Sequence, residues 1–151
     1  MAEGILQDLH NDHQEVSAMI ETILNTEDGK ERGSLFKELM TNLLAHAHAE
    51  QNVLYKKMEK TEDEEGRKFA FEGTNEHVLI ENQLQLLAKG RNKASEQWTA
   101  QMTVLKELVQ HHVGEEESTG FSRARKEFDK EQLEKMAEQF QRQKEKLMSE
   151  A

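Results

Sequence analysis

Two stretches of the chain repeat one pairing of a histidine with a glutamate. His46 and Glu50 are four residues apart, and His112 and Glu116 repeat this spacing near the other end of the chain. Residues four apart on an α-helix lie on the same face, one turn above each other. Each pair therefore presents an imidazole nitrogen and a carboxylate to one point, and two such pairs facing each other favour a metal site.

Two further histidines extend this pattern. His13 and His77 each occupy a core position in an otherwise apolar helical stripe. A single histidine in such a position is more often a core residue than a ligand. Here, however, four expected helices each place a histidine on the stripe, and burying an unpaired carboxylate is costly. A metal would satisfy all of these side chains at once, so we predict metal binding.

Five amphipathic helices are expected to position these residues. Apolar residues recur at intervals of three and four, which is typical of helices that bury one face. The expected ranges are about 5–24, 35–59, 67–89, 95–125 and 129–150. Ser34 and Ser95 are suitable N-caps, Asp129 with Gln132 resembles a capping box, and the helix around Gly73 is open to a break.

The connections between these helices are short, which predicts antiparallel neighbours. We therefore expect an all-α fold: an up-down-up-down four-helix bundle over about 5–125, with an additional C-terminal helix over about 129–150. Residues 1–151 are expected to form a single domain. The C-terminal helix packs either on its own bundle or on a second copy, which leaves a homodimer through this helix open.

The composition excludes several classes of function. The chain has no cysteine, which rules out thiolate ligands and disulfides. Its net charge of -10 argues against nucleic acid and anionic membranes as partners. No apolar run approaches the roughly 18 residues of a membrane span. Because the first residues also lack the features of a secretory signal, we expect a cytoplasmic location.

Imidazole and carboxylate ligands without sulfur suit iron, zinc, manganese, nickel or copper. Six or seven ligands exceed the needs of one tetrahedral zinc ion. Helical bundles with inward glutamate and histidine hold paired iron or manganese ions, in which carboxylates bridge and histidines cap. The ligand chemistry therefore favours a non-haem site with two iron ions, and the same ligands also suit zinc or manganese.

The order of these residues is similar to that of the haemerythrin-like, HHE cation-binding family. A histidine precedes each His-x-x-x-Glu pair, and an aromatic residue, Tyr55 or Phe121, follows each glutamate by five residues. The resemblance spans residues 13–121. It implies a bundle that binds two irons, with histidine ligands and bridging glutamates at His13, His46, Glu50, His77, His112 and Glu116.

The resemblance leaves a seventh ligand to be found. In haemerythrin itself, the third helix carries two histidines four residues apart. Here Gly73 stands four residues before His77, and Glu81 stands four residues after it. Glu81 is therefore the candidate for the seventh metal ligand, and the alternative is a solvated surface glutamate.

Three other histidines compete for these roles. His10 lies one turn before a predicted ligand and is expected to support it. His48 should point away from the site, because two residues turn a helix by about 200°. His111 forms a rival pair with Glu115, but we favour His112 because it continues the apolar stripe.

Two ferrous ions with an open position bind O2 or NO, or react with peroxide. The resemblance therefore implies a di-iron protein that binds or reacts with a small diatomic molecule or peroxide. An alternative is a metal- or oxygen-sensing interaction module without turnover. A bundle that keeps its histidines only for structure is a third alternative, and whether the protein is an enzyme stays open.

Overall fold

The computed structural model describes residues 3–151, and all of its regular elements in that range are helical. This confirms the prediction of an all-α fold. The long helices are α1 (Ile5–Leu24), α2 (Gly29–Glu50), α4 (Glu64–Lys89), α5 (Glu96–Glu115) and α7 (Lys130–Ser149). The shorter segments are η1 (Gln51–Tyr55), α3 (Lys56–Met58), η2 (Glu116–Gly120) and α6 (Phe121–Glu127).

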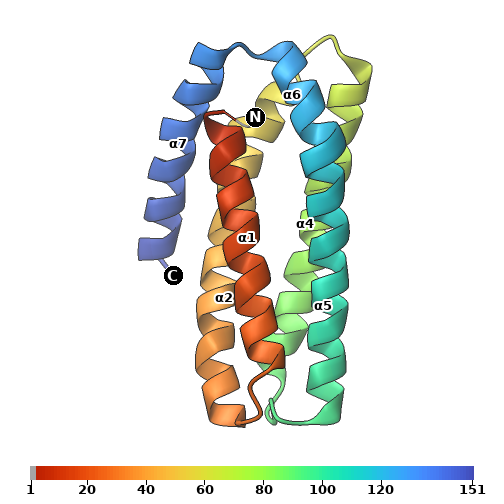
Figure 1. Ribbon diagram of the computed structural model, residues 1–151, viewed down its shortest axis with the longest axis vertical. Coiled ribbons are helices and arrows are strands. Elements are labelled where there is room, and N and C mark those ends of the chain that lie inside the picture. Colours follow the sequence, from red (N-terminus) through yellow and green to blue (C-terminus); the bar gives the residue numbers. More distant parts are fainter. Residues whose placement is uncertain (1–2) are drawn as a thin grey trace.

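The long helices form a bundle. Figure 1 shows α1, α2, α4 and α5 lying side by side, with connections at alternating ends, and α7 lying along the outside. α7 packs against α1 and α2 of its own chain. An interface with a second copy through α7 stays a prediction.

Side-chain caps mark the starts of α2, α5 and α7, whereas α1 and α4 begin without one, and the predicted start of α2 is wrong. α2 begins at Gly29, six residues before the predicted start, because the Asp28 carboxylate accepts the Glu31 amide hydrogen bond at 2.9 Å. Ser34 therefore lies inside α2 and does not cap it. Ser95 caps α5 as predicted, and the capping box predicted at the start of α7 is present.

Two π-helical segments interrupt the long helices at the paired glutamates. η1 follows Glu50, and η2 begins at Glu116. A π-helix bonds residue i to residue i+5, so a residue five positions along the chain returns to nearly the same face. The aromatic residues Tyr55 and Phe121 therefore face the interior together with the glutamates that precede them.

Apolar side chains form two separate clusters along the bundle axis. The upper cluster lies at the end where α7 begins and includes Leu9, whereas the lower cluster includes Val16 and Trp98. His13 lies between Leu9 and Val16 on α1, so a polar layer separates the two clusters. Gly73 does not break α4, which runs through it without interruption.

The start of α1 lies very close to α7. Gly4 adopts a φ of 52°, and a Cβ built on it would lie 2.4 Å from the Leu133 backbone. Only glycine tolerates both the positive φ and this close approach without strain.

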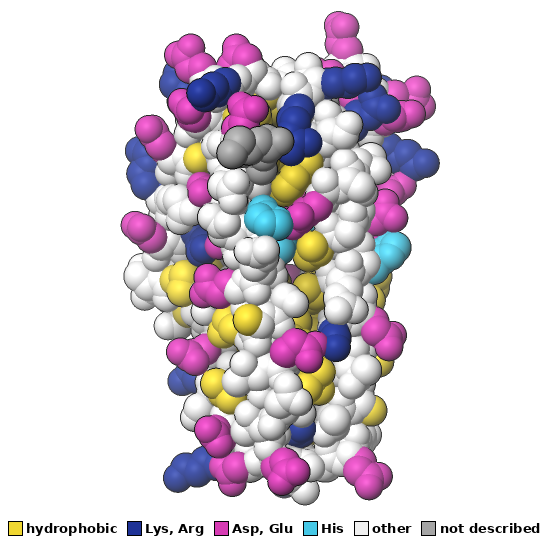
Figure 2. Space-filling model, in the orientation of Figure 1, with side chains coloured by type: hydrophobic (Ala, Val, Ile, Leu, Met, Phe, Trp, Pro, Cys, Tyr) yellow, Lys and Arg dark blue, Asp and Glu magenta, His cyan; other side chains and the backbone are white. Residues whose placement is uncertain are grey.

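The outer surface is strongly charged. Figure 2 shows acidic and basic side chains at both ends and along both sides of the bundle, with small hydrophobic patches mainly along the middle of this face. Over the described residues, no helix combines the length and the apolar character that crossing a membrane requires.

Candidate metal centre

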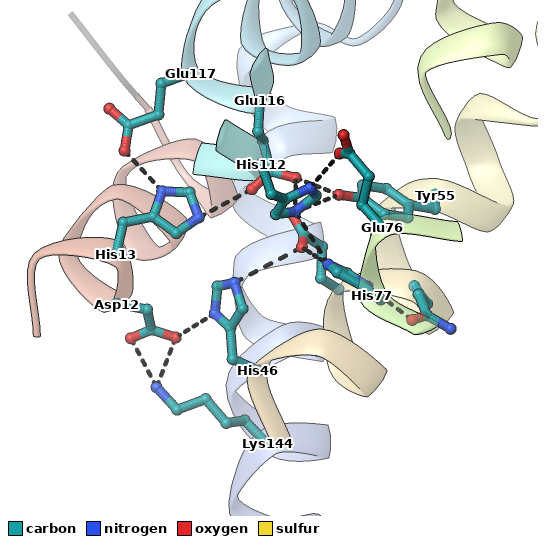
Figure 3. A network of polar contacts seen from close by, with 12 residues as sticks. Asp12, His13, His46, Tyr55, Glu76, His77, His112, Glu116, Glu117 and Lys144 are labelled. Atoms are coloured by element: carbon teal, nitrogen blue, oxygen red, sulfur yellow. Dashed lines mark hydrogen bonds and ion pairs between the residues drawn. The ribbon is translucent and has the colours of Figure 1, made fainter. Parts of the chain in front are cut away.

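Four histidines and two glutamates meet in the polar layer between the two apolar clusters. All six are buried, and both glutamates have no exposed surface. They come from all four long helices of the bundle core, and Figure 3 shows the four histidine rings arranged around this centre. The residues are His13, His46, Glu50, His77, His112 and Glu116.

The ligand atoms fall into two groups of three. One group is His13, His46 and Glu116, and the other joins the remaining three residues; within each group the atoms lie within 4.8 Å of one another. The Glu116 carboxylate lies 3.0 Å from His13 Nε2 and 3.7 Å from His112 Nε2, so it reaches a histidine of each group.

Glu50 spans the two groups in the same way. Its Oε1 atom lies 3.3 Å from His77 Nε2 and 3.7 Å from His46 Nε2. The two carboxylates are therefore positioned between the groups, where bridging ligands of a two-metal site would lie.

Each histidine directs Nε2 to the centre and holds Nδ1 with a polar partner. His46 Nδ1 lies 2.9 Å from Asp12, and His112 Nδ1 lies 2.7 Å from Glu76. In both cases the partner directly precedes the histidine of the neighbouring helix. Such outer contacts fix the tautomer and the ring orientation of a metal-binding histidine.

The other two histidines use the residue that follows each buried glutamate. His13 Nδ1 lies 2.7 Å from Glu117, and His77 Nδ1 lies 2.7 Å from Gln51. The supporting contacts are therefore exchanged between helices, and each histidine is oriented by a helix other than its own.

Tyr55 also reaches the centre. Its hydroxyl donates a short hydrogen bond to Glu116 and lies 3.3 Å from His112 Nε2. Its ring stacks on His77 with centroids 5.4 Å apart. A Cβ at Gly73 would lie 2.8 Å from this ring, so the tyrosine fills the space that a side chain at that position would need.

Burial and neighbouring charges perturb the titration of the centre. Burial, together with the Glu116 carboxylate, raises the pKa of Glu50 well above its usual range. Burial and the neighbouring His112 lower the pKa of His77 well below its usual value. A neutral histidine with an available nitrogen is the form that binds metal.

Four inward atoms make no hydrogen bond among the described residues. They are His13 Nε2 and Glu116 Oε1, which lie 3.0 Å apart as an ion pair, and both carboxylate oxygens of Glu50. Buried polar atoms without partners are costly and uncommon. These atoms converge on the two groups, and nitrogen with oxygen donors suits divalent transition metals. The residues therefore fit a pair of metal ions.

A small cavity lies on the lower side of the histidines. Its volume is about 20 Å³, and apart from the histidines its walls are mostly aliphatic. This is room for about one water-sized molecule. His13, Val109 and Val113 also line a neighbouring groove of about 210 Å³ between α1 and α5, so this groove lies directly beside the cavity.

Glu81, predicted as a seventh ligand, lies away from both groups. Its side chain is 36% exposed and lies 3.8 Å from His48, which is itself on the surface. Of the competing histidines, His111 is 66% exposed and contacts Glu76 at 3.3 Å. His10 contacts Glu117 at 2.9 Å, so it touches a supporting carboxylate instead of the centre.

The sequence reasoning missed most of the supporting residues. An acidic residue precedes each lone histidine in both halves, and this repeated signal points to Asp12 and Glu76. Neither the Tyr55 hydroxyl contact nor the contact between Asp12 and Lys144 has such a signal, because the partners are far apart in the chain.

A helical bundle with six buried, convergent histidine and glutamate side chains defines a cation-binding helical protein. The chain belongs to the family of the hemerythrin HHE cation binding domain, whose family model matches residues 4–124. The predicted family resemblance is thereby confirmed. α7 lies beyond the matched range.

One curated relative is a protein named DNA nickase from Nostoc sp. (strain PCC 7120 / SAG 25.82 / UTEX 2576). It is 26% identical over 136 residues, which are 90% of this chain but 38% of the relative. The chain thus spans well under half the length of this relative. No solved structure matches the chain significantly.

Proposed function

We propose that the protein holds a non-haem di-iron centre in which Glu50 and Glu116 bridge the two ions. In this proposal α1, α2, α4 and α5 act as an up-down-up-down four-helix bundle within one domain. The observation that carries the proposal is the placement of each buried carboxylate within reach of a histidine of both groups. The same ligands would also accept zinc or manganese.

The proposed activity is the binding of O2 or NO, or the reaction with peroxide. Iron supplies electrons and an open coordination position for such a molecule. The cavity of about 20 Å³ beside the histidines limits access to molecules of very few atoms. Its aliphatic walls favour a small uncharged ligand over a hydrated ion.

The protein's own groups prepare this site. The outer contacts of the four histidines hold every Nε2 toward the centre before metal binds. Burial, followed by the Glu116 and Glu50 charges, raises the pKa of Tyr55 well above its usual value. The phenol therefore keeps its proton and orients one Glu116 oxygen by donating a hydrogen bond to it.

Our proposal includes no nucleic-acid partner, because a net charge of -10 opposes binding to a phosphate backbone. A sensing module without turnover is the second candidate, and the contact of Lys144 in α7 with Asp12, the partner of His46, favours it.

The test is anaerobic loading with ferrous iron, followed by a metal count and admission of air. We expect two irons per chain and new near-ultraviolet and visible absorption from a ferric pair. Reversal on degassing would indicate a carrier, whereas consumption of added peroxide would indicate an enzyme. Absence of retained iron would contradict the di-iron proposal.

A further inference from the structure

α7 contacts the candidate metal centre although it lies outside the family match. The match ends at residue 124, whereas α7 spans Lys130–Ser149 and packs along α1 and α2. The two contacts come from one face of α7. They are made by Phe140 and Lys144, which are four residues apart and therefore share that face.

Phe140 touches a ligand histidine directly. Its side chain has no exposed surface, and its ring lies edge-on to the His46 ring with centroids 5.7 Å apart. Displacement of α7 would therefore expose one side of the His46 imidazole.

Lys144 reaches the same histidine through a carboxylate. Its Nζ donates to both oxygens of Asp12 at 2.8 Å, and Asp12 accepts from His46 Nδ1 at 2.9 Å. Figure 3 shows this chain of contacts running from Lys144 to the His46 ring. The lysine holds Asp12 in the position that orients His46.

The corresponding carboxylate in the other half has no such support. Glu76 orients His112, and its other ion-pair partner among the described residues is the exposed His111. Among the described residues, therefore, only Asp12 of these two carboxylates is linked to a helix outside the four-helix core.

α7 packs on the outside of the bundle through one apolar stripe. Its buried residues are Leu133, Met136 and Phe140, with Ala137 and Leu147 partly buried beside them, and its outer face carries many charged side chains. An element packed through one face opens at lower free energy than the core that it covers. Lys144, whose side chain is 16% exposed, adds to this stripe a polar contact that leads to the centre.

We propose that α7 is a metal-responsive element, in which Lys144 is a positioning residue that couples helix docking to metal binding at His46. Coupling between two events is reciprocal, so metal tightens α7 and docked α7 tightens metal. This inference rests on the proposed metal centre. It also names α7 as the element that would change its packing in the sensing alternative.

The test is amide hydrogen exchange of the full chain with and without ferrous iron under anaerobic conditions. In the wild type, exchange in α7 should slow about fivefold or more on metal loading, relative to amides 100–107 of α5, which lie beyond the first turn of that helix. Met102 and Leu105 in this segment belong to the lower cluster, so its amides report global stabilisation. Lys144→Met should remove this excess, whereas Lys146→Met, an exposed lysine of the same helix, should keep it.

Asp12→Asn interrupts the same contacts from the other side and should act like Lys144→Met. Two irons in the wild type with equal protection of α7 in both states would overturn this inference and leave the metal centre intact. An excess that persists in Lys144→Met would also overturn it. A wild type that retains no iron would instead overturn the proposed centre, and this inference with it.

Discussion

The α1/α2 half and the α4/α5 half present nearly the same ligands but support them differently. In each half an acidic residue precedes a lone histidine, and a His-x-x-x-Glu pair follows on the next helix. The residue after the glutamate is Gln51 in one half and Glu117 in the other, and the aromatic residue is Tyr55 or Phe121. The ligand layer is therefore close to symmetric, whereas its surroundings are not.

This difference makes the two candidate metal positions inequivalent. Phe121 stacks on His13 with centroids 6.5 Å apart, as Tyr55 stacks on His77, but it brings no hydroxyl to the centre. Lys144 supports only the His46 side. A site that binds a small molecule at only one of two metals needs two metal positions with different surroundings. Here the difference comes from residues other than the six candidate ligands.

The largest effect is expected from the two glutamates, which occupy equivalent positions in the two halves. Glu50→Ala and Glu116→Ala should each abolish two-metal loading, because each carboxylate spans both groups. Iron counts per chain measure this effect. His48→Ala, on the surface, should still hold two irons, and so should Glu81→Ala. Retention of two irons in either glutamate variant would show that its carboxylate does not bridge the ions.

Tyr55→Phe would place a phenylalanine five residues after the buried glutamate in both halves, since Phe121 already holds this position in one of them. Removing the hydroxyl leaves a buried Glu116 oxygen without its donor, so metal-free protein should lose about 1.5–3 kcal/mol of unfolding free energy. Urea unfolding after chelation measures this loss. We expect the iron-loaded variant to keep both ions, and loss of one ion would instead identify Tyr55 as a ligand.

Gln51→Glu would remove another difference between the halves, because the residue after each buried glutamate would then be a glutamate. Burial alone lowers the pKa of His13, but Glu116 and Glu117 together raise it above its ordinary value. For His77, which contacts the neutral Gln51, burial and His112 lower the pKa. A carboxylate at position 51 should therefore raise the pKa of His77 toward that of His13.

The sign of the resulting pH dependence follows from proton linkage. Below about 6.5, unfolded chains protonate His77 while the folded protein with its lowered pKa does not, so stability falls as the pH falls through this window. Gln51→Glu should reduce that loss in chelator-treated protein between about pH 7 and pH 5.5. Urea unfolding at both values measures it, with the exposed Gln97→Glu as control. An unchanged pH slope would contradict the assignment.

The smallest effect concerns the helix starts. Asp28→Ala removes the side-chain cap of α2 and should cost about 1 kcal/mol. Asp63, at the start of α4, makes no such cap and pairs with Arg123 at 3.7 Å, so Asp63→Ala should cost less. Thermal unfolding of both variants would compare them, and equal losses would contradict the role of the Asp28 cap.

Local sequence patterns predicted that the helices exist better than they predicted the exact helix starts and the π-helical segments. α1 has the predicted bounds because its apolar stripe is regular, whereas α2 starts early because a capping aspartate precedes Gly29. The π-helical segments were not predicted, since hydrophobic periodicity does not resolve one extra residue in a turn.

The site was predictable to the extent that its spacing is local. His46 and Glu50 converge because one helix carries both, and the repeat brings in His112 and Glu116. The partner of Asp12 lies 132 residues away, and only the packing of α7 brings Lys144 to it. Glu81 was a reasonable candidate by spacing, but its side chain points to the surface because it is off the buried stripe of α4.

The extra residue in η1 and in η2 sets the orientation of the aromatic side chain relative to the candidate ligands on the same helix. Each residue of an α-helix turns the chain by about 100°. Deleting one residue after Glu50 would therefore rotate the remainder of that helix, while His46 and Glu50 before the deletion would keep their orientation. Tyr55 would then turn away from the space above Gly73. The segments thus allow the ligand-bearing and aromatic-bearing parts of one continuous helix to be oriented independently.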